Sequence, residues 1–150
     1  MYKRILIPTD GSETATLGLR EGLRLAKESG AQVRIVHVVD DIGALSPSVY
    51  GAIYTEVTDQ FRAAGANVLA RAKDMAQEAG IDAETQMIEA MGEPAGERIV
   101  KAAKEWQADL IVCGTHGRRG LRRIVIGSDA EFIVRHTPVP LLLVRDSHSR

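Results

Sequence analysis

The stretch LIVCGTHGRRGLRRIVIGS, residues 110–128, contains the pattern that decides the fold. Four apolar residues are followed at once by Gly114, and the pair Gly127 and Ser128 stands in front of a sequence suited to a helix. A solid apolar run of this kind is typical of a strand that is covered on both faces in a parallel sheet. The stretch therefore predicts a buried strand, a glycine-containing connection and a helix that starts near Ser128.

The same alternation of apolar run and helical segment continues on both sides of this stretch. Further strands are predicted at residues 5–7, 33–39, 85–88 and 141–144. Ser12 is a suitable N-cap and Gly30 a suitable C-cap for the first helix. A second helix is predicted from about residue 53 to 79, with Gly65 as an unfavourable residue inside it. Pro94 opens a third helix, the fourth stops before Pro138, and residues 40–52 are expected to form a long loop.

This order of strands and helices predicts an α/β fold in a single domain, residues 1–150. Strands that alternate with helices build a doubly wound parallel sheet with right-handed crossovers and helices on both faces. The chain of 150 residues has the length of one ordinary domain, and its 45% hydrophobic and 26% charged residues are globular values.

Composition also indicates which partners are excluded and in which cellular compartment the protein is expected. The net charge of −1 argues against a nucleic-acid-binding surface. Cys113 is the single cysteine, so an intramolecular disulfide is excluded and a reducing cytoplasm is expected. The N-terminus lacks the apolar region of a signal peptide, and no apolar run approaches the ~20 residues of a membrane helix. We therefore expect a soluble cytoplasmic protein with no membrane contact.

The glycines and arginines after residue 113 suggest a phosphate site. Ligands of doubly wound folds bind beyond the carboxyl ends of the strands, where Gly114 stands. Backbone N–H groups near glycines cradle phosphate oxygens, and a helix N-terminus at Ser128 attracts anions. Positive charge comes from residues 118–126, the intervening segment, which holds Arg118, Arg119, Arg122 and Arg123. The alternative is that the glycines only make turns, Ser128 only caps a helix and the arginines are solvated.

Five ordered segments then carry a family resemblance. They are ILIPTDGSE at 5–13, VHVVD at 36–40, GEP at 92–94, ADLIVCGTHGRRGL at 108–121 and VPLLLVR at 139–145. Together with the spacing Gly-x-x-Gly, nine residues, Gly-Ser, they resemble the ATP-binding branch of the universal stress protein family over residues 3–145. The resemblance implies a five-stranded parallel sheet in the order 3-2-1-4-5.

The resemblance also implies roles for single residues. Gly114, Gly117, Gly127 and Ser128 match the glycines and serine that hold the phosphates, and Arg118 adds positive charge beside them. Asp10 matches the aspartate that contacts the ribose, although an Asx-turn in the DGS sequence explains it equally well. Val38 matches the valine whose backbone meets adenine, although by sequence alone it is a core residue. Pro8 and Thr9 are expected to line the same crevice.

One position departs from the family pattern. Asp129 stands where the family more often carries an apolar residue, and its carboxylate would repel a phosphate or help to hold Mg²⁺. ATP, with or without Mg²⁺, is the leading ligand, and ADP, AMP or a cyclic nucleotide remain alternatives. Cys113 is interpreted as a small buried hydrophobe, and His37 as a packed strand residue.

The predicted function is a nucleotide-dependent stress-response or signalling module that acts through an unidentified protein partner. We find no set of nucleophile, base and acid, so any ATPase activity should be slow. The rival hypotheses are a slow ATPase or nucleotidyl-transfer enzyme, and an interaction module that binds no nucleotide. In the implied strand order, residues 139–145 form an edge strand, which predicts a homodimer paired through that edge; cover by a helix is the alternative.

Overall fold

Five strands and four helices alternate along the described part of the chain. The structure is a computed structural model that describes residues 1–40, 47–115 and 126–146. The elements follow one another as β1 (Arg4–Pro8), α1 (Glu13–Ser29), β2 (Gln32–Val39), α2 (Pro47–Glu78), β3 (Glu84–Glu89), α3 (Ala95–Glu105), β4 (Leu110–Gly114), α4 (Ser128–His136) and β5 (Leu141–Val144). Each predicted strand is present, and both ends of every strand lie within one residue of the predicted position.

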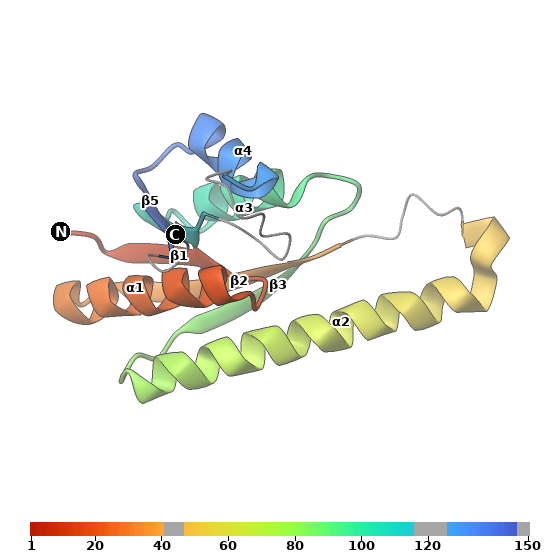
Figure 1. The fold of residues 1–150 in the computed structure, drawn as a ribbon, viewed down its shortest axis with the longest axis horizontal. Coiled ribbons are helices and arrows are strands. Elements are labelled where there is room, and N and C mark those ends of the chain that lie inside the picture. Colours follow the sequence, from red (N-terminus) through yellow and green to blue (C-terminus); the bar gives the residue numbers. More distant parts are fainter. Residues whose placement is uncertain (41–46, 116–125, 147–150) are drawn as a thin grey trace.

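The strands form one parallel sheet in the order β3-β2-β1-β4-β5, which confirms the predicted fold. Figure 1 shows α1 and α2 on one face of this sheet and α3 and α4 on the other. Successive residues of β1 face opposite layers, since Ile5 and Ile7 pack with α1 and α2 while Leu6 packs with α3 and α4. All three side chains are fully buried. The solid apolar runs thus reflect a sheet that is covered on both faces.

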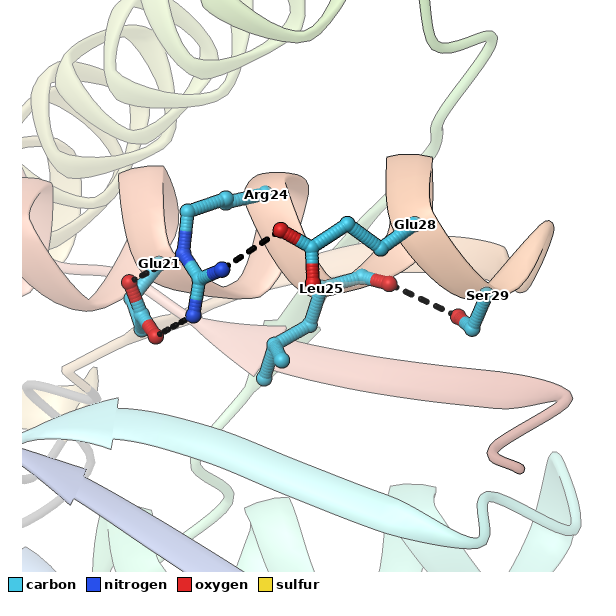
Figure 2. Close-up of polar contacts among 5 residues, drawn as sticks. All are labelled: Glu21, Arg24, Leu25, Glu28 and Ser29. Carbon is cyan, nitrogen blue, oxygen red and sulfur yellow. Dashed lines mark hydrogen bonds and ion pairs between the residues drawn. The ribbon is translucent and has the colours of Figure 1, made fainter.

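The first helix begins and ends at the predicted residues. The Ser12 hydroxyl oxygen accepts a hydrogen bond from the Ala15 N–H at 3.2 Å, and Gly30 closes the helix in the left-handed region at φ 71°. Figure 2 shows the exposed side of α1, where the Arg24 guanidinium lies 2.6 Å from a carboxylate oxygen of Glu21 and 2.6 Å from one of Glu28. These pairs join residues on adjacent turns of α1 and add little to the attachment of the helix to the sheet.

The second helix starts earlier than predicted. Residues 47–52 were expected to belong to a loop, whereas α2 begins at Pro47 and runs to Glu78. Proline is favoured in the first turn of a helix, where its missing N–H is not needed. Gly51 has non-helical angles, φ 37° and ψ −116°, and separates a short first piece from the rest. The loop prediction was therefore wrong for residues 47–52, because Pro47 and Gly51 occur in turns as well as at helix starts.

The other predicted helix ends and the predicted edge position of the last strand agree with the structure to within one residue. Pro94 is the N-cap of α3 and not its first residue, a difference of one position. α4 starts at Ser128 and ends before Pro138, as predicted. β5 lies at an edge of the sheet, because β4 is its partner and the strand order ends there. Within the described residues, no helix has the length and apolar character that crossing a membrane requires.

Candidate functional site

A cavity of about 390 Å³ opens at the carboxyl ends of β1, β2 and β4. Seven of the nine predicted binding residues line it: Pro8, Thr9, Asp10, Val38, Gly114, Gly127 and Ser128. The other two, Gly117 and Arg118, lie outside the described residues, as do His116 and the remaining arginines of the segment. Residues from four separate parts of the sequence therefore meet at one place, the position where ligands of doubly wound sheets bind.

The end of β1 supplies Thr9 and Asp10. The Thr9 N–H donates to the Val36 carbonyl at 2.9 Å, which extends the pairing of β1 and β2 by one residue. Asp10 Oδ1 accepts from the Ser12 N–H at 2.9 Å, so the Asx-turn that the DGS sequence suggested is present. Asp10 also lines the cavity. The turn therefore orients this carboxyl group at the cavity wall, and the two interpretations of Asp10 are compatible.

Val38 places backbone groups at the point where β1 has ended. The carbonyl of Val36 points towards β1, because it accepts from the Thr9 N–H. Alternate residues of a strand direct their backbone groups to the same side, so the N–H and C=O of Val38 also point that way. The paired part of β1 stops at Pro8, opposite Val36. Val38 thus offers one donor and one acceptor towards the cavity.

Gly114 has a packing reason to be glycine. A Cβ at this position would lie 2.6 Å from the carbonyl oxygen of Thr14, and a Cβ on Gly18 would lie 2.9 Å from the backbone nitrogen of Gly114. Real Cβ atoms do not approach that closely, so the start of α1 rests directly on the end of β4. Gly114 is therefore held against α1, and it also lines the cavity.

The N-terminus of α4 carries backbone donors that its own sequence does not satisfy. Gly127 is the N-cap, and its N–H donates to the Thr115 carbonyl at 2.8 Å. The first bond inside the helix runs from the Glu131 N–H to the Gly127 carbonyl at 2.9 Å. The N–H groups of Ser128, Asp129 and Ala130 precede it, and in the described residues no side chain caps them. Gly127, and not Ser128, is the N-cap, so the interpretation of Ser128 as a mere helix cap is wrong.

Asp129 uses its side chain on a neighbouring helix. Its Oδ1 accepts from the Gly96 N–H at 3.1 Å, and Gly96 lies in the first turn of α3. Pro94, the N-cap of α3, has no side chain able to accept this bond, so Asp129 acts as its cap from a distance of 33 residues. The positive end of α3 offsets part of the carboxylate charge. The expected repulsion of a phosphate by Asp129 is thereby reduced.

Several lining residues were not predicted as site residues. From α2 they are Phe61, Ala64 and Gly65, and from α3 they are Ala95 and Ile99. The isolated Gly65 inside a long helix was a usable signal, because a glycine there often marks close packing. A Cβ on Gly65 would lie 2.8 Å from Cδ2 of His37. Phe61 carried no sequence signal, since its role depends on where α2 lies over the sheet.

His37 and Cys113 complete the buried part of the wall. His37 Nδ1 lies 2.8 Å from the Thr9 carbonyl oxygen, so this nitrogen carries the proton and donates. The buried position confirms that His37 is a packed strand residue. Cys113 is 5% exposed, and burial raises the pKa of its thiol to about 12. The thiol is therefore protonated near neutral pH and behaves as the small hydrophobe that the sequence suggested.

The described part of the wall is acidic. Its carboxylates are those of Asp10, Asp40 and Asp129, and it contains no lysine or arginine. No three His, Cys, Asp or Glu side chains within the described ranges are arranged to hold a metal ion by themselves. An anionic ligand in this cavity therefore needs cations from elsewhere, either from the arginine segment or from an ion that it brings with it.

Comparison with known proteins gives consistent results over the whole chain. The profile of the Universal stress protein family matches residues 1–145. Universal stress protein MJ0531 of Methanocaldococcus jannaschii is 37% identical over 145 residues, which are 97% of this chain and 83% of that protein. The solved structure of the protein MJ0577 is 27% identical, with a TM-score of 0.84 and coverage of 99% of both chains.

Two more distant structural neighbours hold nucleotides. One is a universal stress protein in complex with cAMP, 24% identical, with a TM-score of 0.69 and coverage of 97% of this chain and 98% of the other. The other is the universal stress protein of Archaeoglobus fulgidus in complex with dAMP, 23% identical, with a TM-score of 0.72 and coverage of 95% and 98%. At this identity the likeness to the present chain is one of fold.

Proposed function

Because this chain belongs to the universal stress protein family, we propose that it binds an adenine nucleotide, with ATP as the leading ligand, in the cavity at the carboxyl ends of β1, β2 and β4. Nucleotide occupancy would alter the adjacent segment, residues 118–126, and so change a surface that a protein partner recognises. The protein would then be a cytoplasmic signalling module of the stress response. Two structural neighbours in complex with cAMP and dAMP support an adenine ligand.

The observation that carries this proposal is a difference between three helix N-termini beside the cavity. The first turn of α1 is capped by Ser12, and that of α3 by Asp129. The first turn of α4 has a glycine at the N-cap and no side-chain cap from the described residues. Free N–H groups and the helix dipole make such a terminus an anion site. We therefore assign the phosphates to the N–H groups of residues 128–130 and to Gly114, with Gly117 as the further phosphate ligand that the family resemblance implies.

The remaining parts of the nucleotide follow from this position. The adenine edge needs a donor and an acceptor side by side, which the backbone of Val38 offers beyond the end of β1. The ribose hydroxyls need an acceptor between base and phosphates, and Asp10 stands at the end of β1 to supply one. Pro8 and Thr9 line the same cavity. The ligand would lie across the carboxyl ends of the strands, with its base near β2 and its phosphates near α4.

The charge of the cavity wall determines whether ATP binds with or without a counterion. The described wall carries three carboxylates and no basic side chain, so an ATP anion without a counterion would be repelled. We propose that Arg118 and Mg²⁺ share the neutralisation. Mg²⁺ is commonly held by phosphate oxygens with one or two carboxylates, and it needs no cluster of protein ligands. ADP, AMP and a cyclic nucleotide carry less charge and remain alternatives.

A substitution at Gly127 tests the phosphate assignment sharply. Gly127→Asp supplies a cap acceptor to α4 and a negative charge at the proposed phosphate position, at φ −58° and ψ 155°, which suit an N-cap. We expect the fold to gain only a few tenths of a kcal/mol and ATP binding, measured by calorimetry, to be lost. Gly127→Asn caps without the charge, and Gly127→Ala does neither; both should retain more affinity than the aspartate. Undiminished ATP affinity in Gly127→Asp contradicts the assignment.

Slow ATP turnover is an alternative function that can be tested by measuring the products formed from ATP. Release of phosphate or AMP from ATP, compared with a Ser128→Ala variant, separates an ATPase or nucleotidyl transferase from a binding protein. A wild-type rate above that of the variant would favour the enzyme. Absence of any ATP-induced heat or thermal shift would favour the third candidate, an interaction module without nucleotide.

We also propose that two copies pair through β5 to form a homodimer. The Pro140 carbonyl accepts from Ile111 of β4, and the Val144 carbonyl accepts from Thr115, the residue after β4. The backbone groups of Leu143 therefore point to the open edge of the sheet. Two such edges can pair about a two-fold axis. Leu143→Pro removes an outward N–H and should give a monomer by light scattering, whereas Leu143→Ala should stay dimeric. A dimer that survives Leu143→Pro argues for another interface.

A further inference from the structure

Phe61 is a large apolar side chain in an unusual position. It lines the cavity and is 40% exposed. The residues of α2 that pack on the sheet lie along one side of the helix, at Gly65, Leu69, Ala72 and Ala76. Phe61 lies four residues before Gly65 and continues that side by one turn. The ring thus belongs to the face of α2 that packs inward, at the point where the inward packing stops.

The end of β2 explains why the ring is not covered. A Cβ on Gly65 would lie 2.8 Å from Cδ2 of His37 and 3.2 Å from Cγ2 of Val39, so Gly65 sits over the last residues of the strand. α2 runs back along the sheet in the direction opposite to β2 (Figure 1). The preceding turn, about 5.4 Å further along, therefore places Phe61 beyond Val39, the last residue of β2.

The plane of a bound base follows from the backbone of Val38. Backbone groups of a strand form hydrogen bonds within the plane of the sheet. A base whose edge bonds to the Val38 N–H and C=O therefore lies close to that plane, in line with the end of β1. Its two faces then look towards the two helix layers. Phe61 and Ala64 line the cavity from the α2 layer, and Ala95 and Ile99 line it from the α3 layer.

We propose that Phe61 stacks on the nucleobase and closes one face of the base site. This inference rests on the proposed nucleotide site and adds a determinant of base recognition to it. An aromatic ring over a planar base is a favourable contact that does not depend on hydrogen-bond pattern, and its strength rises with the area of the base. Phe61 therefore favours a large purine over a small pyrimidine, while the Val38 backbone reads the edge.

The two phenylalanines of the chain provide the experiment. The protein contains only Phe61 and Phe132, so labelling with 4-fluorophenylalanine gives two ¹⁹F signals. Phe132 stacks on His136 with ring centroids 4.1 Å apart and does not line the cavity, which makes it an internal control. We expect Mg²⁺-ATP to shift the Phe61 signal and leave the Phe132 signal in place. Inorganic tripolyphosphate, which has no base, should move neither signal strongly.

Variants give the matching affinities. Phe61→Ala should weaken ATP binding about tenfold or more and leave tripolyphosphate binding unchanged. Phe61→Tyr keeps the ring and should restore affinity for ATP, whereas Phe61→Leu should restore only part of it. The ring is partly exposed and lies beyond the strands, so these variants should keep the circular dichroism spectrum of the wild type.

The possible outcomes distinguish a failure of the stacking role of Phe61 from a failure of the proposed nucleotide site. ATP binding with an unmoved Phe61 signal and a wild-type affinity in Phe61→Ala overturns the stacking role and leaves the nucleotide site intact. An equal loss of ATP and tripolyphosphate affinity in Phe61→Ala also overturns it, because the effect is then not on the base. A wild-type protein that binds neither ligand refutes the nucleotide site itself, and the stacking role with it.

Discussion

Gly18→Ala tests whether close packing of α1 on β4 holds Gly114 in the cavity wall. The added Cβ would lie 2.9 Å from the backbone nitrogen of Gly114 and 3.1 Å from the carbonyl carbon of Cys113. Alanine improves helix propensity by about 1 kcal/mol, and overpacking a core contact costs about 1–3 kcal/mol. Both atoms are backbone of an inner strand and have little freedom to move, so the upper part of that range applies. We expect a net loss of about 1–2 kcal/mol.

A matched control lies one turn further along the same helix. A Cβ on Gly22 would meet Ile7 Cδ1 at 2.5 Å, and this atom is the end of a side chain that can rotate. Gly22→Ala has the same gain in propensity and should therefore cost less than Gly18→Ala. Urea unfolding followed by circular dichroism measures both free energies of unfolding. A loss of about 1 kcal/mol lowers the melting temperature by roughly 2–4 °C in a domain of this size.

The two variants should differ in nucleotide binding as well. Gly114 lines the cavity and Ile7 does not, so Gly18→Ala should weaken ATP binding and Gly22→Ala should leave it close to the wild-type value. If Gly18→Ala were as stable as the wild type, or less harmful than Gly22→Ala, the close approach of α1 and β4 would not be the reason for glycine at this position.

Three further predictions concern side chains around the site and on α1. Asp129→Asn keeps an acceptor for α3 and removes a charge, so it should leave stability nearly unchanged and tighten ATP binding in calorimetry, whereas Asp129→Ala should cost about 1 kcal/mol in urea. Burial raises the pKa of Cys113 from 9.0 to about 12, so its stabilising effect is complete below pH 9 and is lost as the pH rises towards 12. Cys113→Ala should flatten that decline, and the wild-type thiol should react with a disulfide reagent only after unfolding. The hydrogen bond from Arg24 lowers the pKa of Glu21, so this pair stabilises above the ordinary carboxyl pKa and is lost in acid. Because Arg24 is exposed, Arg24→Gln should cost little at low salt and nothing measurable at about 1 M salt.

Local sequence patterns predicted the elements because those patterns arise from burial. The run at residues 110–113 and its counterparts are apolar on both faces, and only a doubly covered strand uses such a run. The order of the strands came from the family resemblance, since periodicity does not specify which strands are neighbours. The start of α2 was missed because Pro47 and Gly51 are common in turns as well as at helix starts.

The site was predictable where its residues follow a strand directly and hidden where it depends on packing between elements. Asp10 and Gly114 each stand at a strand end, and strand ends meet at one edge. The bond from Gly96 to Asp129 joins positions 33 residues apart, and His37 lies 28 residues from the Thr9 carbonyl that it contacts. Contacts between residues so far apart in the sequence produce no local sequence pattern. The role of Asp129 as a cap for α3 could therefore be found only from the structure.

The glycines near the cavity are explained by different physical causes. Comparing these causes shows which glycine gives evidence about a ligand. Gly18, Gly65 and Gly114 have no room for a Cβ, so packing alone accounts for them and they say nothing about a ligand. Gly127 has φ −58°, which any residue adopts, and as a glycine N-cap it brings no side-chain acceptor to the first turn of α4. A sequence that caps α1 with a serine and α3 with an aspartate, yet leaves α4 with a glycine, keeps three backbone donors available. An anionic ligand at those donors would supply the missing cap, and the cost of the glycine to the free protein is small, a few tenths of a kcal/mol.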